Sequence, residues 1–122
     1  MKRKAPATRR DRVLHRDRLH CVYCGGAFLP EELTLDHVEP RMRGGDDSEG
    51  NLVACCTGCN RSKGGLAAWS YLAGRPVERS NFLAAAESAD TRHAAPVWPR
   101  LLRAIREAAD AEARRERGTG SR

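Results

Sequence analysis

Aromatic residues are scarce in this chain of 122 residues: Phe, Trp and Tyr make up 5% of it, although 40% of its residues are hydrophobic. A chain of this length normally forms one domain, because separate cores need roughly 100 residues or more each. A two-domain enzyme is therefore excluded. Because few large side chains are available to fill a core, we expect something besides hydrophobic packing to hold the fold together.

Long hydrophobic runs are also missing, since no uninterrupted apolar stretch exceeds five residues. A helix that crosses a bilayer needs about 20 apolar residues, so the sequence predicts no membrane span and no membrane partner. Three of the first four residues are basic, but the apolar segment of an export signal does not follow them. We therefore expect a cytoplasmic protein.

Positive charge is concentrated at the N-terminus. The formal net charge is +6, and residues 1–20 hold eight Lys or Arg against two Asp, which accounts for the whole excess. Such a segment attracts polyanions, nucleic acid above all, although a solvated, solubilising tail has the same composition. Residues 1–8 contain almost nothing apolar, so we expect them to form a disordered basic arm.

Four of the five cysteines form two Cys-x-x-Cys pairs, Cys21 with Cys24 and Cys56 with Cys59. A spacing of two residues lets one tight turn direct both sulfurs inward, and four thiolates can close a tetrahedron around Zn²⁺. A reducing compartment disfavours a disulfide framework. The sequence therefore predicts a structural zinc site. A redox dithiol is the alternative, but no βαβ pattern surrounds either pair.

Three further residues near these pairs are not expected to bind the metal. Cys55 ends an apolar stretch, and we interpret it as a small buried hydrophobe. His15 and His20 flank the first pair, but four thiolates leave no position for them.

The elements expected in the first half of the chain are a helix, a hairpin and a second helix. The segment 34–38 is β-branched and aliphatic, which predicts a strand that Pro40 ends. Segment 51–54 is its candidate partner, and the Gly-, Asp- and Ser-rich residues 41–50 between them are typical of a loop. We expect short helices over 9–19 and from 56 or 57 to Gly64-Gly65.

Three helices are expected in the second half. Trp69, Tyr71 and Leu72 should pack a short helix, 66–72, onto the zinc module rather than stack on bases. An Ala-rich helix over 81–89 has Ser80 as its candidate cap. A last helix should begin at Pro99 and run to about Arg117. Its apolar stripe serves packing or contact with a protein partner, and consists of Leu101, Leu102, Ile105 and Ala108.

An ordered series of residues in the first half resembles the signature of the HNH endonuclease family. It comprises Leu35-Asp36-His37-Val38, a proline two positions on, Gly44-Gly45, Asn51-Leu52 and Cys56-x-x-Cys59-Asn60-Arg61-x-Lys63-Gly64. The residues that usually precede this motif in the family are matched as well, by Arg16-Asp17 and by Cys21-Val22-Tyr23-Cys24-Gly25. The resemblance covers about Arg9 to Leu66, and implies a ββα-metal fold that cleaves phosphodiester bonds in DNA with a divalent cation.

The fold class expected is therefore α+β: a small HNH-like ββα-metal core, a structural zinc knuckle and a helical C-terminal extension. The expected division is a basic arm over 1–8, a zinc-braced nuclease domain over 9–66, a helical extension over 67–117 and a flexible tail over 118–122.

Each residue of the motif has a chemical role that suits phosphodiester hydrolysis. The imidazole of a histidine ordinarily has a pKa of ~6.5, so the residue type at His37 suits a general base that deprotonates water. Asp36 is the candidate ligand of a hard divalent cation, Mg²⁺ or Mn²⁺, which stabilises the charge on the departing 3′ oxygen. The resemblance implies that Asn60, where many members have His, also binds this cation, and an amide oxygen suits a hard ion. It also implies that Asn51, the second catalytic candidate, has a structural role. Its amide can bridge backbone groups of the loop.

Two conditions on the geometry follow. In a regular strand Asp36 and His37 face opposite sides, so the pleat must break there or the substrate must straddle the strand edge. Four thiolates leave no open position on zinc, so the zinc should be a scaffold rather than a catalyst. The candidates for phosphate contacts, each equally an ordinary solvated charge when taken singly, are Arg41, Arg43, Arg61 and Lys63.

A non-catalytic zinc module that binds nucleic acid or protein is the alternative function. It would use the basic arm and leave Asp36 and His37 idle. The sequence indicates neither a target sequence nor an oligomeric state.

Overall fold

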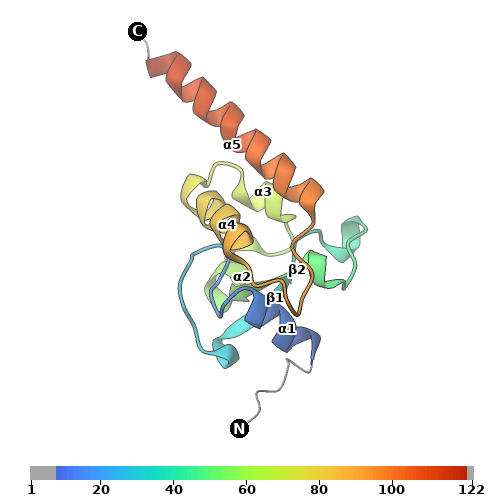
Figure 1. The fold of residues 1–122 in the computed structure, drawn as a ribbon. Helices are drawn as coiled ribbons and strands as arrows, with labels where there is room; N and C mark the ends of the chain where they lie inside the picture. The colour runs from blue at the N-terminus through green and yellow to red at the C-terminus, as the bar shows by residue number, and fades with distance from the viewer. Residues whose placement is uncertain (1–7, 121–122) are drawn as a thin grey trace.

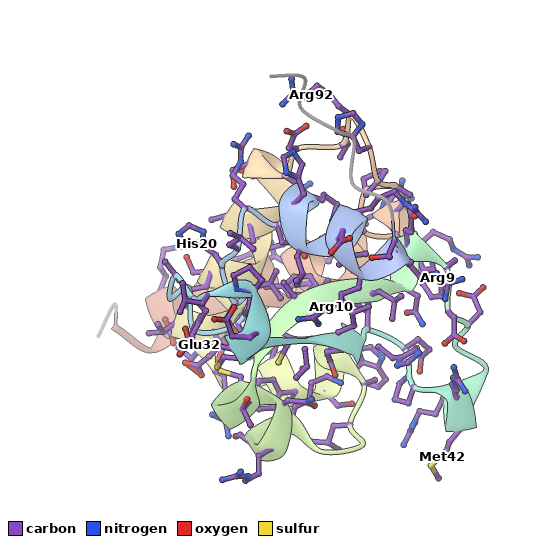
Figure 2. All side chains as sticks on the ribbon, turned by 90° about the horizontal axis from the view of Figure 1, so that it is seen from below. Arg9, Arg10, His20, Glu32, Met42 and Arg92 are labelled. Carbon is purple, nitrogen blue, oxygen red and sulfur yellow. The ribbon has the colours of Figure 1, made fainter. Side chains whose placement is uncertain are left out.

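The computed structural model describes residues 8–120, with side chains through residue 117. Its centre is a two-stranded antiparallel sheet of β1, Leu33–His37, and β2, Leu52–Cys56. Helices α1, Arg9–Arg16, and α2, Thr57–Lys63, each contact both strands and lie on opposite sides of the sheet (Figure 2). The α+β class and the hairpin followed by a helix are confirmed.

The basic arm predicted over 1–8 lies outside the described residues except for Thr8. The Thr8 hydroxyl accepts a hydrogen bond from the Asp11 N–H at 3.0 Å and so caps α1. The tail predicted over 118–122 is described only as backbone, to Gly120 in the last helix.

Both strands lie where the sequence predicts them, shifted by one or two residues at their ends. The register pairs Asp36 with Val53 and His37 with Leu52, so the pairing continues without a break to the last residue of β1. All five residues of β2 are buried, because helices cover both sides of the sheet. Cys55 is fully buried in this strand, as expected for a small hydrophobe.

The two short helices end for local reasons. Helix α2 begins after Cys56, whose Sγ accepts from the Cys59 N–H at 3.4 Å, and ends at Gly64, which has a positive φ of 57°. Helix α1 ends three residues earlier than predicted. Arg18 and Leu19 both adopt positive φ angles, 58° and 57°, and turn the chain toward the first cysteine pair.

Arg16 is fully buried, so it does not contribute to the exposed positive charge expected of residues 1–20. Its guanidinium donates two hydrogen bonds to the Asp17 carboxylate, at 2.8 and 2.9 Å. It also donates to three backbone carbonyls from separate segments, those of Glu49 at 2.9 Å, Leu52 at 2.6 Å and Ala95 at 2.7 Å. This side chain therefore joins α1 to the start of β2 and to the segment that precedes the last helix.

Replacing Arg16 by alanine is expected to lower the free energy of unfolding by about 3–5 kcal/mol, because it leaves the buried Asp17 charge without its cation and removes one donor from each of three carbonyls. Urea denaturation of the zinc-loaded protein measures this loss. The matched control is Arg9→Ala, an exposed arginine of the same helix, which should change stability by no more than about 0.5 kcal/mol. Equal midpoints for the two variants would contradict the assigned role.

Three helices, α3, Ala68–Leu72, α4, Pro76–Ser88, and α5, Pro99–Gly120, pack on one another next to the sheet. The second half of α5 extends away from the other elements (Figure 1). Among the described residues, none of these helices has the length and apolar content needed to cross a bilayer.

Two expectations for this region are wrong. Helix α4 begins at Pro76, so Ser80 lies inside the helix and does not cap it. Tyr71 and Leu72 are buried in the core as expected, but Trp69 is 49% exposed. The α5 stripe is predicted more closely: Ile105 is buried, and Leu101 and Leu102 pack against the core, but Ala108 is exposed.

Candidate functional site

The four cysteines of the two pairs form one cluster at the start of α2. Their Sγ atoms all lie within 4.8 Å of one another, and Cys24 and Cys56 are 3.9 Å apart. A tetrahedron with Zn–S bonds of 2.3 Å separates its sulfurs by about 3.8 Å, so the donor set and its spacing fit one ion of this kind. The cluster could therefore hold a metal such as zinc.

Both histidines beside the cluster point to other partners. His20 Nδ1 lies 2.7 Å from the Arg18 carbonyl oxygen, and His15 Nε2 lies 3.4 Å from an Asp90 carboxylate oxygen. Among the described residues, the metal-binding group consists of the four cysteines alone.

The thiols of the cluster differ in acidity. The Cys55 thiol beside Cys21 lowers the pKa of Cys21 to about 4, whereas burial raises the pKa of Cys24 and of Cys59, with a further increase from the Cys21 charge. The Cys21 thiolate therefore forms readily, whereas Cys24 and Cys59 need a nearby cation to lose their protons as readily. This is the behaviour expected of a metal site whose ligands lose their protons when the ion binds.

A cleft of about 330 Å³ lies at the end of β1, where the strand meets α2. Asp36 and His37 line it from the strand, and Asn60 lines it from the helix. The complete lining is Leu35, Asp36, His37, Pro40, Arg41, Met42, Asn60, Lys63, Gly64 and Gly65. We call it the His37 cleft.

The pleat of β1 is not broken at Asp36 and His37, because their pairing with β2 is regular. The first of the two conditions, a broken pleat, is therefore not met, but both residues still line one cleft.

Asp36 is buried and holds two hydrogen-bond donors. The Tyr23 hydroxyl donates to Oδ2 at 2.7 Å, and the Lys63 ammonium donates to Oδ1 at 3.1 Å. Burial raises the pKa of Asp36, and these two partners oppose that shift. A carboxylate oxygen can accept two bonds, so one lone pair on each oxygen remains for a cation.

Lys63 is only 2% exposed and also donates to the His37 carbonyl oxygen at 3.2 Å. Lys63 was expected to contact a phosphate; in the structure its ammonium lines the His37 cleft and is bonded to Asp36 and to the His37 carbonyl. The other candidates for phosphate contacts, Arg41, Arg43 and Arg61, are exposed.

His37 is held by a carboxylate that the sequence reasoning did not single out. Its Nε2 lies 2.7 Å from Oδ1 of Asp47, and the Arg41 guanidinium bonds to the same carboxylate. Hydrogen bonds from Arg41 and His37 lower the pKa of Asp47 to about 2, so this group is ionised at neutral pH. Asp47 was part of a segment interpreted only as turn-forming.

Asn51 is fully buried and connects the two ends of the loop that carries Asp47. Its Oδ1 accepts from the Glu39 N–H at 2.7 Å, and its Nδ2 donates to the carbonyls of Glu39 at 2.9 Å and Asp46 at 2.8 Å. The loop closes so tightly here that a Cβ on Gly45 would lie 1.7 Å from the Glu39 carbonyl oxygen. Asn51 thus fixes the backbone just after His37.

Asn60 donates through Nδ2 to the Thr34 hydroxyl at 3.0 Å. This leaves its Oδ1 as the acceptor that could ligate an ion. A carboxylate from Asp36 and an amide oxygen from Asn60, lining one cleft, are donors of the kind that a hard divalent cation prefers.

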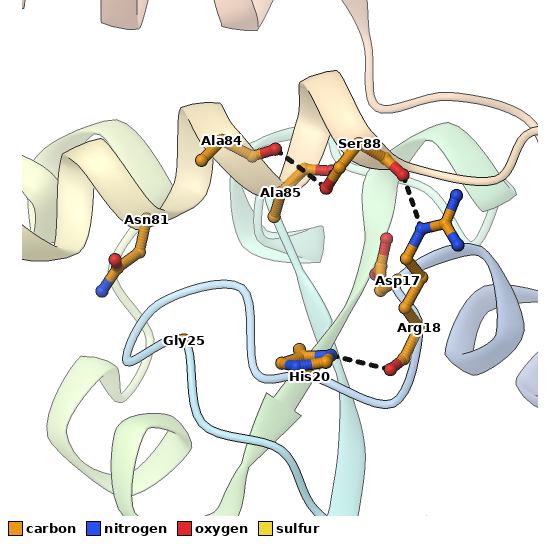
Figure 3. Close-up of a pocket in the computed structure, with 8 residues that line it drawn as sticks. All are labelled: Asp17, Arg18, His20, Gly25, Asn81, Ala84, Ala85 and Ser88. Atoms are coloured by element: carbon orange, nitrogen blue, oxygen red, sulfur yellow. Dashed lines mark hydrogen bonds between the residues drawn. The ribbon is translucent and has the colours of Figure 1, made fainter.

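A second cleft, of about 270 Å³, separates α4 from the turn before the first cysteine pair (Figure 3). Its polar side chains are engaged in holding these segments together: Arg18 Nε donates to the Ser88 carbonyl at 2.7 Å, and Asn81 Nδ2 donates to the Tyr23 carbonyl at 2.8 Å. It contains none of the candidate catalytic residues, and we assign it a structural role.

The family comparison agrees with this geometry. Residues 21–65, which span both cysteine pairs and the His37 cleft, match the model of the HNH endonuclease family. This segment is therefore similar to an HNH endonuclease domain. The resemblance inferred from the motif is thereby confirmed.

Curated relatives of the HNH domain include two proteins named CRISPR-associated endonuclease Cas9. The one from Actinomyces naeslundii is 41% identical over 59 residues, and the one from Corynebacterium diphtheriae is 38% identical over 52 residues. The alignments cover 46% and 42% of this chain, but only 5% of each relative. The chain therefore corresponds to a small part of these proteins.

The likeness in fold extends beyond the HNH domain. The crystal structure of the Type II-C Cas9 enzyme from Actinomyces naeslundii matches 83% of this chain with a TM-score of 0.61 and 23% sequence identity. The match covers 12% of that enzyme. Some of the residues outside 21–65 therefore share the same arrangement.

Proposed function

We propose that this chain is a metal-dependent endonuclease that hydrolyses phosphodiester bonds in DNA. The observation that carries the proposal is that His37, Asp36 and Asn60 line one cleft beside the edge of β1. The match to the HNH endonuclease family supports it. We place the nuclease domain over residues 9–66 and treat 67–117 as its helical extension.

His37 acts as the general base. When its Nε2–H donates to the ionised Asp47, Nδ1 is the nitrogen left to take a proton from the attacking water. Asp47 orients the imidazole and stabilises its protonated form, as the carboxylate of a catalytic triad does. His37 is 30% exposed, so water can reach it.

Asp36 and Asn60 would hold the catalytic cation, Mg²⁺ or Mn²⁺. When bound, this ion supplies positive charge next to the departing 3′ oxygen. Tyr23 and Lys63 orient the Asp36 carboxylate, and Lys63 favours its ionised form. Asn51 holds the loop that carries Asp47 against the end of β1.

The four-cysteine cluster binds zinc and serves as a scaffold. Four thiolates close the coordination sphere, so the zinc contributes to folding and not to the chemical step. Contacts to DNA phosphates come from three exposed arginines, Arg41, Arg43 and Arg61. All three are close in the sequence to residues that line the His37 cleft.

Cleavage of supercoiled plasmid by the zinc-loaded chain tests the proposal. We expect nicked or linear product in the presence of added Mg²⁺ or Mn²⁺ and none without a second divalent ion, because the zinc has no open position. Gel electrophoresis over a series of times gives the rate. Plasmid binding without cleavage in either ion would instead favour a non-catalytic zinc module.

A further inference from the structure

A third cleft has a volume of about 410 Å³, and two of its lining residues directly follow the His37 cleft residues in the sequence. Val38 and Glu39, the two residues that directly follow His37, line it. The rest of its lining comes from α3, from the residue before α5 and from the start of α5, namely Trp69, Trp98, Arg100, Leu101 and Ala104. We call it the Trp69 cleft.

Both tryptophans of the chain line this cleft, and each is attached to a fixed part of the nuclease core. The Ala68 N–H, next to Trp69, donates to the Val38 carbonyl at 2.9 Å and holds α3 against the end of β1. The Trp98 N–H donates to the Gly50 carbonyl at 3.1 Å, and its ring packs so close that a Cβ on Gly50 would lie 2.5 Å from Trp98 Cδ1.

The exposure of Trp69 is not explained by packing. Its neighbours Tyr71 and Leu72 are buried, whereas Trp69 is 49% exposed on a helix fixed next to the catalytic strand. A large half-exposed indole is costly in water and well suited to stacking with a flat partner.

The charges around the Trp69 cleft suit a phosphate-bearing partner. Arg100 lines it, and α5 begins at Pro99, so the positive end of the helix dipole lies at the same place. Arg103, one turn further along α5, is exposed as well. Glu39 is the acidic residue in the lining and repels a phosphate. A phosphate is therefore favoured on the α5 side of the cleft, and an uncharged ring on the Glu39 side.

We propose that the Trp69 cleft binds an unpaired nucleobase of the DNA strand whose phosphate occupies the His37 cleft. The inference rests on the proposed nuclease function and specifies its substrate: DNA that is single-stranded or unpaired next to the cut. Aromatic rings beside a basic groove are the usual platform for single strands, and their stacking tolerates any base.

Binding of a fluorescein-labelled oligothymidylate of about 12 nucleotides tests this assignment. The zinc-loaded full chain is titrated without Mg²⁺, and fluorescence anisotropy gives Kd. Trp69→Ala should raise Kd about 10-fold, within the range of one lost stacking contact, and Trp69→Phe should retain most of the affinity because the phenyl ring still stacks. The control is Val77→Ala on α4, a residue that is 67% exposed and lies outside the cleft; its Kd should equal that of the wild type.

A duplex of the same length and a strand that is abasic at every position complete the test. Both should bind equally well to the wild type and to Trp69→Ala, because neither offers an unpaired base to the indole. Intrinsic tryptophan fluorescence adds a direct readout. Oligothymidylate should quench the fluorescence of the wild type strongly and that of Trp69→Phe much less.

An unchanged oligothymidylate Kd for Trp69→Ala would overturn the assignment, and so would an equal loss of affinity for the duplex. These measurements do not depend on cleavage. A chain that never cuts DNA but shows the expected Trp69 effects retains the base site and loses the nuclease function, whereas a chain that cuts DNA without those effects loses only the base site.

Discussion

Replacing His37 by alanine is expected to lower the rate of plasmid cleavage by about 10²–10⁴-fold, the usual contribution of a general base. The side chain is partly exposed at the end of β1, so its removal leaves no large cavity and should leave the fold intact. Single-turnover rates at saturating Mg²⁺ measure the effect on the chemical step. Thermal melting of the same preparation verifies that the variant is folded.

His93→Ala is the matched control for this experiment. His93 is an exposed histidine that lines none of the clefts described, so its removal should leave the cleavage rate unchanged. A folded His37→Ala variant that cuts DNA as fast as His93→Ala would remove His37 from the mechanism, and the nuclease proposal would need another base.

Removal of the zinc is expected to unfold the nuclease domain. Structural zinc sites contribute about 10–16 kcal/mol of apparent binding free energy, more than the stability of a typical small domain. Cys59→Ser, or a strong chelator, should therefore abolish the cooperative thermal transition followed by circular dichroism. Elemental analysis should find one zinc per chain in the wild type.

The Cys55→Ala variant is the control that distinguishes the loss of a zinc ligand from the loss of any buried cysteine. Cys55 is buried beside the cluster but is not one of its four members, so this variant should still bind one zinc and unfold cooperatively. A folded wild type without bound metal, with dithiols that titrate, would instead indicate a thiol redox protein.

The elements set by local patterns could be predicted from the sequence. Turn-forming residues bound both strands, and a glycine with positive φ ends α2, so their ends are correct to within one or two residues. The four-cysteine cluster could also be predicted, because the Cys-x-x-Cys spacing itself limits where the sulfurs can lie.

The partners of the candidate catalytic residues could not be predicted in this way. Tyr23, Lys63 and Asp47 contact Asp36 or His37 only after three separate segments come together, and no periodicity records such contacts. Arg16 was missed for the same reason, since its carbonyl partners lie 33 to 79 residues away in the chain.

The errors in the C-terminal half have separate causes. Proline fixes its own φ near the helical value, so Pro76 starts α4 before the serine that was expected to cap it. The exposure of Trp69 depends on where α5 crosses α3, and a short apolar segment does not reveal which of its faces another helix will cover.

The attachment of Trp98 to Gly50 places the base of α5 one residue from Asn51 along the chain. Because α5 extends beyond the other elements, a load on its far end acts with a long lever arm on this attachment. A displacement of the base of α5 would therefore be transmitted through Gly50 to Asn51, the residue that holds the loop after His37.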